Sequence, residues 1–212
     1  MADLANISIL RMVHFQNVEY ILKNGVCSRE HTQADPNYIN IGHRQLITDR
    51  HIHPVPIDGA GNLGEYVPFY FAGHTPMLYL IMNGYQGVEQ RPQKDIVFLI
   101  SKVGKIKENG LEYVFTNMNA KIAIADFYNN DEDFDRLRWD IIHNRIWKND
   151  ENNPARQDYK QAEFLVRSHV PANCITALIV KTVRKKALFD QMISEMGLEI
   201  PVFIDNNCKL YY

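Results

Sequence analysis

The chain has 212 residues, of which 46% are hydrophobic and 23% are charged, so we expect one globular domain over residues 1–212 with a sizeable core. Its 23 Lys and Arg against 25 Asp and Glu give a net charge of −2, which excludes a global positive field for nucleic acid and leaves only local binding. Three cysteines without CxxC spacing exclude a disulfide framework and favour a reducing cytoplasm. Residues 1–20 do not have the pattern of a secretion signal, and no run of eighteen apolar residues occurs, so we expect a soluble protein that does not enter a membrane.

The first 64 residues predict a strand, a helix and then a long loop. The apolar run at residues 7–13 indicates a strand, and the one-sided apolar stripe over residues 18–24 predicts a helix. Asn17 is expected to cap the start of this helix, and Gly25 suits the left-handed backbone that often follows a helix end. Residues 28–64 are rich in His, Asn, Asp, Pro and Gly. Because they exceed an ordinary connection in length, we expect this loop to bind a ligand.

The rest of the chain mixes strands and helices. Apolar density returns at residues 66–71. Apolar runs rich in β-branched and aromatic residues predict strands at residues 96–100, 113–116, 161–166, 175–180 and 201–204. Helices are predicted from Pro76 onward with Thr75 as the cap, near residues 120–128 and 134–146, and at residues 184–196. Residues 147–159 form a second polar loop. Because strands and helices do not alternate regularly, the pattern favours an α+β fold with a mostly antiparallel sheet.

The sequence lacks the motifs of the commonest enzyme classes. It contains no GxxxxGK[ST] phosphate loop, HExxH pair or GxSxG elbow. The GxGxxG spelling at residues 59–64 lies in the polar loop and does not follow an apolar strand, so it lacks the context of a dinucleotide-binding fingerprint. His51 and His53 are the closest histidine pair, but no Cys or carboxylate lies at a recognised ligand spacing from them. We therefore expect no metal site.

Glu163 is the most informative polar residue, because it interrupts an apolar strand directly after a polar loop. Burying an unpaired carboxylate is strongly unfavourable, so Glu163 should face either a functional cleft or solvent on a half-exposed strand. His14 lies at a strand-to-helix junction and is either structural or catalytic. Arg44 and Arg50 in the long loop are either solvated charges or a clamp for phosphate.

Four segments in order along the chain resemble the DarT family of DNA ADP-ribosyltransferases, the toxins of toxin–antitoxin pairs. The resemblance extends from residue 13 to residue 166, with its most specific parts in the third and fourth segments. The segments are VHFQN at 13–17 followed by Ile21, Leu22 and Gly25; IGH at 41–43 followed by Arg50; VPFYF at 67–71 with TPMLY at 75–79; and KQAEFLV at 160–166.

The resemblance implies an ADP-ribosyltransferase fold, in which a split, mostly antiparallel sheet flanked by helices holds NAD+ between two half-sheets. Glu163 would be the catalytic residue. A carboxylate at the ribose stabilises the oxocarbenium-like centre formed when nicotinamide leaves, and it can accept a proton from the attacking base. Arg50 would support the phosphates and the reacting geometry. Asp49 precedes Arg50 where the family often has a second arginine, so Arg44 stays open as the alternative.

The resemblance also implies which residues bind NAD+ as the co-substrate. His14 would hold the amide or the ribose at the nicotinamide end, and Asn17 would add a polar contact near the same end. Tyr70, Phe71 and Met77 would line the pocket for nicotinamide and its ribose.

The implied acceptor is a base of single-stranded DNA, with thymine and guanine as the two candidates, since an unstacked base is cheaper to present in a single strand. In the polar loop before Glu163, Arg156 would bind phosphate and Tyr159 would stack. A DarG-like macrodomain antitoxin would be the partner, and we expect a monomer. Two alternatives remain at this point: the same fold acting on RNA or protein, and a non-catalytic nucleotide-binding module.

Overall fold

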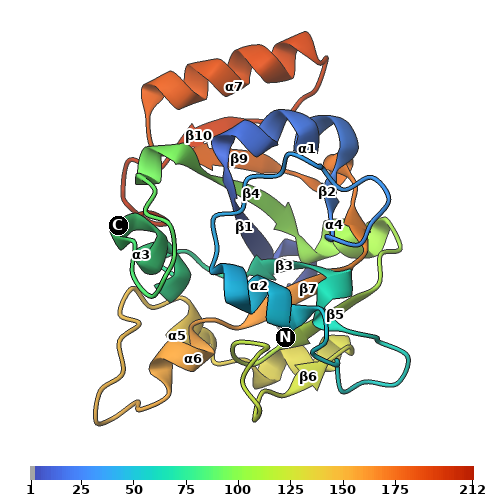
Figure 1. Ribbon diagram of the computed structural model, residues 1–212, viewed down its shortest axis with the longest axis vertical. Coiled ribbons are helices and arrows are strands. Elements are labelled where there is room, and N and C mark those ends of the chain that lie inside the picture. Colours follow the sequence, from blue (N-terminus) through green and yellow to red (C-terminus); the bar gives the residue numbers. More distant parts are fainter. Residues whose placement is uncertain (1–2) are drawn as a thin grey trace.

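The structure, a computed structural model, describes residues 3–212, with the side chains of Arg44 and Leu46 outside that description. Within this part of the chain, eight strands form one sheet in the order β10-β9-β4-β1-β3-β7-β5-β6, and β2 and β8 form a small second sheet (Figure 1). The strands are β1 (Ser8–His14), β2 (Val26–Cys27), β3 (Tyr66–Tyr70), β4 (Ile96–Lys102), β5 (Tyr113–Thr116), β6 (Phe127–Tyr128), β7 (Glu163–Arg167), β8 (His169–Val170), β9 (Ala177–Val180) and β10 (Val202–Ile204).

The α-helices are short, apart from the last one. They are α1 (Val18–Asn24), α2 (Arg44–Arg50), α3 (Pro76–Asn83), α4 (Val103–Glu108), α5 (Trp139–Ile142), α6 (Arg156–Tyr159) and α7 (Val183–Glu195). Single turns of 3-10 helix lie at Leu4–Asn6, Phe15–Asn17, Leu63–Glu65, Gln93–Asp95, Asp131–Arg136 and Ala172–Cys174. No helix within residues 3–212 has both the length and the apolar character needed to cross a membrane.

The main sheet is divided into two halves between β1 and β3. β1 pairs with β4 along its whole length, and β3 pairs with β7 along its whole length, whereas β1 and β3 are matched only at Leu10 and Tyr70. All strand pairs of this sheet are antiparallel except β9 with β10. The expected α+β fold with a split, mostly antiparallel sheet is therefore confirmed.

Helices cover both faces of the sheet. α1, α4 and α7 pack on one face, where Ile9, Val13 and Leu99 are buried, and α3 packs on the other face against Leu10 and Phe98. Figure 1 shows the end of the chain next to α3, on the far side of the sheet from α7. These packed faces hold the two half-sheets in place around the gap between them.

An aromatic stack stabilises the second half-sheet. The rings of Phe115 and Phe134 stack with centroids 4.1 Å apart, and Phe164 lies 6.4 Å from Phe134. All three side chains are fully buried, and burial of each contributes about 1.5–3 kcal/mol. β7, which carries Glu163, is thus anchored on a rigid core.

The start of α3 and the end of α1 lie where the sequence predicts them. The Thr75 hydroxyl accepts a hydrogen bond from the Leu78 N–H at 3.2 Å with Pro76 at the first position of α3. Gly25 ends α1 at a φ of +80°, and a side chain there would collide with the His169 ring and the Val170 carbonyl oxygen. Asn17 occupies the N-cap position of α1 as expected, but its side chain makes no capping hydrogen bond.

Three predictions of secondary structure are wrong. The predicted helix at residues 120–128 is a turn that ends in β6, because the Asn117 side chain bonds both the N–H and the carboxylate of Asp126 at 3.0 and 2.8 Å and closes the chain on itself. The helix predicted at 134–146 is reduced to a 3-10 turn and α5. The long loop at 28–64 contains α2.

Candidate active site

Glu163 and Arg50 form a buried ion pair. The Arg50 Nη1 lies 3.0 Å from Glu163 Oε2 and donates a hydrogen bond to Oε1 at 3.3 Å. Only 4% of the Glu163 side chain and 17% of the Arg50 side chain are exposed. The alternative of a solvent-facing Glu163 is therefore wrong, and the guanidinium offsets the cost of burying the carboxylate.

Two further hydrogen bonds fix Glu163 in place. Its Oε1 accepts the Ala120 N–H at 3.1 Å, and its own N–H donates to the Thr116 hydroxyl at 3.1 Å. That hydroxyl in turn donates to the Met118 carbonyl at 2.6 Å. The bends between β5 and β6, where a helix was predicted from residue 120 onward, deliver the Ala120 amide to the carboxylate. Glu163 is thus held at the start of β7 in one geometry, as a catalytic group requires.

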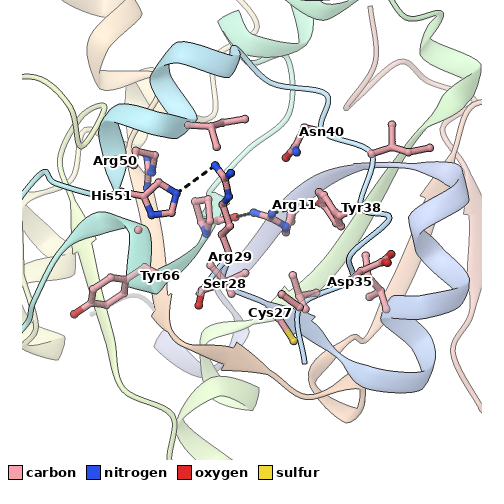
Figure 2. Close-up of a pocket in the computed structure, with 18 of the residues that line it drawn as sticks. Arg11, Cys27, Ser28, Arg29, Asp35, Tyr38, Asn40, Arg50, His51 and Tyr66 are labelled. Atoms are coloured by element: carbon pink, nitrogen blue, oxygen red, sulfur yellow. Dashed lines mark hydrogen bonds between the residues drawn. The ribbon is translucent and has the colours of Figure 1, made fainter. Parts of the chain in front are cut away.

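A cavity of about 820 Å³ opens beside this pair. It is bounded by α1, residues 27–40, α2 and the first part of β3 (Figure 2). Four guanidinium groups line it, from Arg11, Arg29, Arg50 and Arg91, together with the carboxylates of Asp35 and Glu89. The cavity is large enough for a dinucleotide and predominantly cationic.

Arg11 reaches across the gap between the two half-sheets. It extends from β1, and its Nη1 donates to the Pro68 carbonyl of β3 at 2.8 Å, while its Nη2 donates to the Tyr38 hydroxyl at 3.4 Å. Figure 2 shows the Arg11 side chain between Tyr38 and Arg29. Arg11 therefore connects both half-sheets and the loop wall of the cavity.

Several guanidinium donors in the cavity are buried without a partner among the described residues. They are Arg11 Nε, Arg50 Nη2 and Arg91 Nε. A buried donor with no acceptor costs about 1–3 kcal/mol. An anionic ligand would satisfy these donors and recover that cost, so this side-chain set fits a molecule with phosphate groups.

His14 is buried at the end of β1, 5% exposed, and its Nδ1 accepts the Gln16 N–H at 3.4 Å. Burial, and secondarily the positive charge of Arg91, lowers the pKa of His14 below its ordinary value. Its imidazole is therefore neutral near pH 7 and can donate one hydrogen bond to an amide or a hydroxyl.

A model of the family described as "ssDNA thymidine ADP-ribosyltransferase, DarT" matches residues 10–212. The chain belongs to the DarT family. A DNA ADP-ribosyl transferase of Escherichia coli O127:H6 is 34% identical over 195 residues, covering 92% of this chain and 89% of the relative. A DNA ADP-ribosyl transferase of Thermus sp. strain 2.9 is 32% identical over 195 residues, 91% of this chain and 86% of that protein. This DarT-family chain is thus a DNA ADP-ribosyltransferase.

Solved DarT structures have the same fold. Thermus sp. 2.9 DarT in complex with ADP-ribosylated ssDNA superposes with a TM-score of 0.86 at 27% identity, over 97% of this chain and 96% of that one. Thermus sp. 2.9 DarT in complex with NAD+ superposes with a TM-score of 0.79 at 28% identity, over 97% and 98% of the two chains.

Among the residues predicted to act in the DarT reaction, Arg50 lines the large cavity and contacts Glu163 directly. The Arg44 side chain lies outside the described part of the structure. Asn17 uses both ends of its amide on Ile39, accepting its N–H and donating to its carbonyl at 2.9 Å each. Asn17 thereby ties the loop wall of the cavity to α1. Its contact with NAD+ stays a prediction.

The three residues predicted to line the nicotinamide pocket lie apart from the lining of the large cavity. Tyr70 stands opposite Glu163 in the β3–β7 register, and burial, with Glu163 as the next cause, raises the pKa of its hydroxyl. The Phe71 ring packs on Trp139 and Phe164 in the core, and Met77 packs beside the apolar face of α3. Their roles at nicotinamide stay predictions.

The two residues predicted to bind DNA, Arg156 and Tyr159, contact other residues of the chain. Arg156 pairs with Asp150 at 2.6 Å and donates to the Lys148 carbonyl at 3.1 Å. The Tyr159 ring lies under the Arg138 guanidinium at 5.7 Å. Their contact with DNA stays a prediction.

Four residues of the site were not predicted from the sequence: Arg11, Arg29 and Arg91, which line the large cavity, and Thr116, which bonds Glu163. Of these, Arg11 alone could have been found, because it is a charged residue in the middle of an apolar strand. The others are recognised only through contacts between distant segments. No group of three or more His, Cys, Asp or Glu side chains that could hold a metal occurs within residues 3–212.

Proposed function

We propose that this chain transfers ADP-ribose from NAD+ to thymine in single-stranded DNA and releases nicotinamide. The observation that carries the proposal is the buried Glu163–Arg50 pair at the edge of a cavity with unpaired guanidinium donors. The family description names thymidine, which favours thymine over guanine. The Thermus complexes with NAD+ and with ADP-ribosylated ssDNA support both substrates.

In this proposal the cavity arginines bind the pyrophosphate of NAD+. Arg11 and Arg91 each keep a buried donor for this purpose. His14, neutral near pH 7, would donate to the nicotinamide amide or its ribose. Arg50 has one nitrogen on Glu163 and another without a partner, so it would hold the carboxylate and a ligand oxygen together.

The transfer breaks the bond between the ribose C1′ and nicotinamide, and nicotinamide leaves with the bonding electron pair. Positive charge develops on the ribose, and the Glu163 carboxylate would stabilise it. In thymine N1 is already bonded to deoxyribose, so N3 is the ring nitrogen that can attack C1′. Its proton must leave as the new bond forms, and the Glu163 carboxylate would accept it.

We also propose that the activity is toxic and is countered by a DarG-like macrodomain that removes the modification. The family and its curated relatives favour DNA over RNA or protein as the acceptor, and an enzyme over a non-catalytic binding module. The fixed geometry of Glu163 also argues against the module, because binding alone does not require a buried carboxylate that accepts hydrogen bonds from both Arg50 and Ala120.

The test is mass spectrometry of short oligonucleotides incubated with the protein and NAD+. Strands with a single thymine should gain one ADP-ribosyl group, and otherwise identical strands without thymine should gain none. Duplexes should react poorly, because unpairing the base costs a few kcal/mol. ADP-ribosylation of RNA or protein with every single strand unmodified would refute the proposal.

A further inference from the structure

A second cavity, of about 330 Å³, lies at the other end of β3. The large cavity is lined by residues 66–68, whereas the second is lined by residues 71–74, which follow the strand. Tyr70, which faces Glu163 in the register, lies between the two sets. From residue 68 to residue 72 a strand covers about 13 Å, so one extended ligand can span the distance.

The second cavity is cationic and has no opposing charge. Its ionisable lining groups are His74, His143, Arg145, Lys160 and Lys209, and neither Asp nor Glu lines it within the described residues. Like charges brought together without a counter-charge are unfavourable unless an anion joins them. The large cavity, in contrast, contains two carboxylates.

His74 is buried with one ring nitrogen unpaired. It is 3% exposed, and its Nε2 has no hydrogen-bond partner among residues 3–212. Its φ of +50° lies in the left-handed region that side chains rarely adopt. Strain and an unsatisfied buried nitrogen in one residue are typical of a ligand site.

Lys160 holds the wall of this cavity. Its buried ammonium donates to the Ile142 carbonyl at 2.5 Å and to the Asn144 carbonyl at 2.6 Å. These bonds fix the backbone on either side of His143 and place Arg145 at the cavity. Lys160 precedes Glu163 by three residues, so the cationic wall is rigidly linked to the catalytic strand.

A row of aromatic rings extends outward from His74. The Tyr212 ring lies 5.0 Å from His74 and 5.7 Å from Tyr79, and Tyr79 lies 5.3 Å from Trp147 and 6.0 Å from Tyr85. Tyr85 is 51% exposed. In Figure 1 this region is where α3 meets the end of the chain. Cationic groups beside aromatic rings are typical of surfaces that bind single-stranded nucleic acid.

We propose that the second cavity binds a backbone phosphate of the acceptor DNA strand close to the modified base. The inference rests on the proposed function and adds the position of the strand, which would run from Glu163 toward the aromatic row. The phosphate oxygens would satisfy His74 and neutralise Arg145 and Lys209.

The test uses the variant Arg145→Gln/Lys209→Gln, because both side chains belong to exposed residues and their removal should not disturb folding. Arg184→Gln/Lys186→Gln removes the same charge from α7, which packs on the opposite face of the sheet from the cavity, and is the matched control. Binding of a thymine-containing oligonucleotide should weaken about tenfold in the cavity variant. The slope of log affinity against log salt should fall by about 0.7 for one lost phosphate contact. The affinity for NAD+ should stay within twofold.

A second measurement identifies which phosphate of the oligonucleotide binds in the second cavity. Oligonucleotides that each carry one uncharged methylphosphonate, at successive positions around the thymine, should show one position at which wild type and control bind weakly. The cavity variant should not respond to that substitution. The proposal would be overturned if each methylphosphonate weakened binding equally in wild type, the cavity variant and the control variant. It would also be overturned if the cavity and control variants bound DNA equally well.

A loss of NAD+ affinity in the cavity variant equal to its loss of DNA affinity would also overturn it, and would indicate a nucleotide phosphate instead. Failure of the proposed function is distinguishable, because wild-type protein would then modify no oligonucleotide at all.

Discussion

The two cavities on either side of the Leu10–Tyr70 match differ in charge. The larger one combines four arginines with the carboxylates of Asp35 and Glu89, whereas the smaller one has only basic groups. NAD+ carries a positive nicotinamide ring and a negative pyrophosphate, and a DNA backbone carries only negative charge. The contrast therefore assigns a mixed-charge ligand to the first cavity and a polyanion to the second.

The Glu163–Arg50 pair, which we propose to be catalytic, lies at the boundary. Glu163 faces Tyr70 across the strands, and Arg50 reaches it from the wall of the large cavity. A base held toward the second cavity and a ribose held toward the first would meet at this carboxylate. Loss of Glu163 should therefore remove chemistry without removing either binding function.

The largest expected effect is that of Glu163→Gln. Glutamine keeps the size and one acceptor oxygen for Arg50 and Ala120, so the protein should fold and bind both NAD+ and DNA. It cannot stabilise the ribose cation or take the base proton, and transfer should fall at least about a hundredfold. Transfer rates measured by oligonucleotide mass shift check this.

Glu112→Gln is the matched control, because Glu112 is an exposed partner of Arg167 on the same half-sheet. It should retain full transfer. Transfer by Glu163→Gln within tenfold of wild type would contradict a catalytic role for the carboxylate.

Sequence reasoning reached the fold through signals that act over a few residues. The Thr75 cap, the strand at 113–116 and the apolar run after Glu163 all depend on near neighbours, and they were confirmed. The helix at 120–128 failed because Asn117 and Asp126 close a turn that propensity does not reveal.

The site was only partly accessible from the sequence. Motif resemblance singled out Glu163 and Arg50 separately, but they are 113 positions apart in the sequence, and no local pattern shows that they touch. The sequence does not show the charge difference between the cavities either. Arg11 and Arg91 in the first cavity, and His74 and Lys209 in the second, are distant in the sequence and become neighbours only in the folded chain.

Arg11→Met should have an intermediate effect that is confined to the first cavity. The variant leaves the Pro68 carbonyl without its donor across the half-sheets, at a cost of about 1–3 kcal/mol in the free energy of unfolding. It also removes a cation from the cavity, so NAD+ affinity should fall by about tenfold. Calorimetry with NAD+ and denaturant unfolding measure the two effects.

Arg167→Met is the control for Arg11, because Arg167 pairs with Glu65 and Glu112 at the surface, where an ion pair contributes about 0–1 kcal/mol. It should leave NAD+ affinity unchanged. If Arg11→Met weakens DNA binding as strongly as NAD+ binding, the two cavities are not separate in function.

The smallest expected effect is a loss of folding stability at acidic pH. Burial, followed by the charges of Arg145 and Lys160, lowers the pKa of His74 below the ordinary 6.5, although the backbone carbonyls of Tyr211 and Lys209 oppose this. In the unfolded chain His74 takes up a proton as the pH falls below about 6.5, whereas in the folded chain it stays neutral to a lower pH. The free energy of unfolding therefore decreases as the pH falls.

Arg145→Gln removes one of the charges that lower the pKa of His74. The variant should therefore lose less melting temperature between pH 7.5 and pH 5.5 than wild type, whereas Arg184→Gln, far from His74, should lose as much as wild type. An NMR titration of the His74 ring gives the direct measurement. Bound DNA should raise the same pKa, because a phosphate in the second cavity favours the imidazolium, whereas NAD+ in the first cavity should move it far less. An equal rise with both ligands would contradict the assignment of the polyanion to the second cavity.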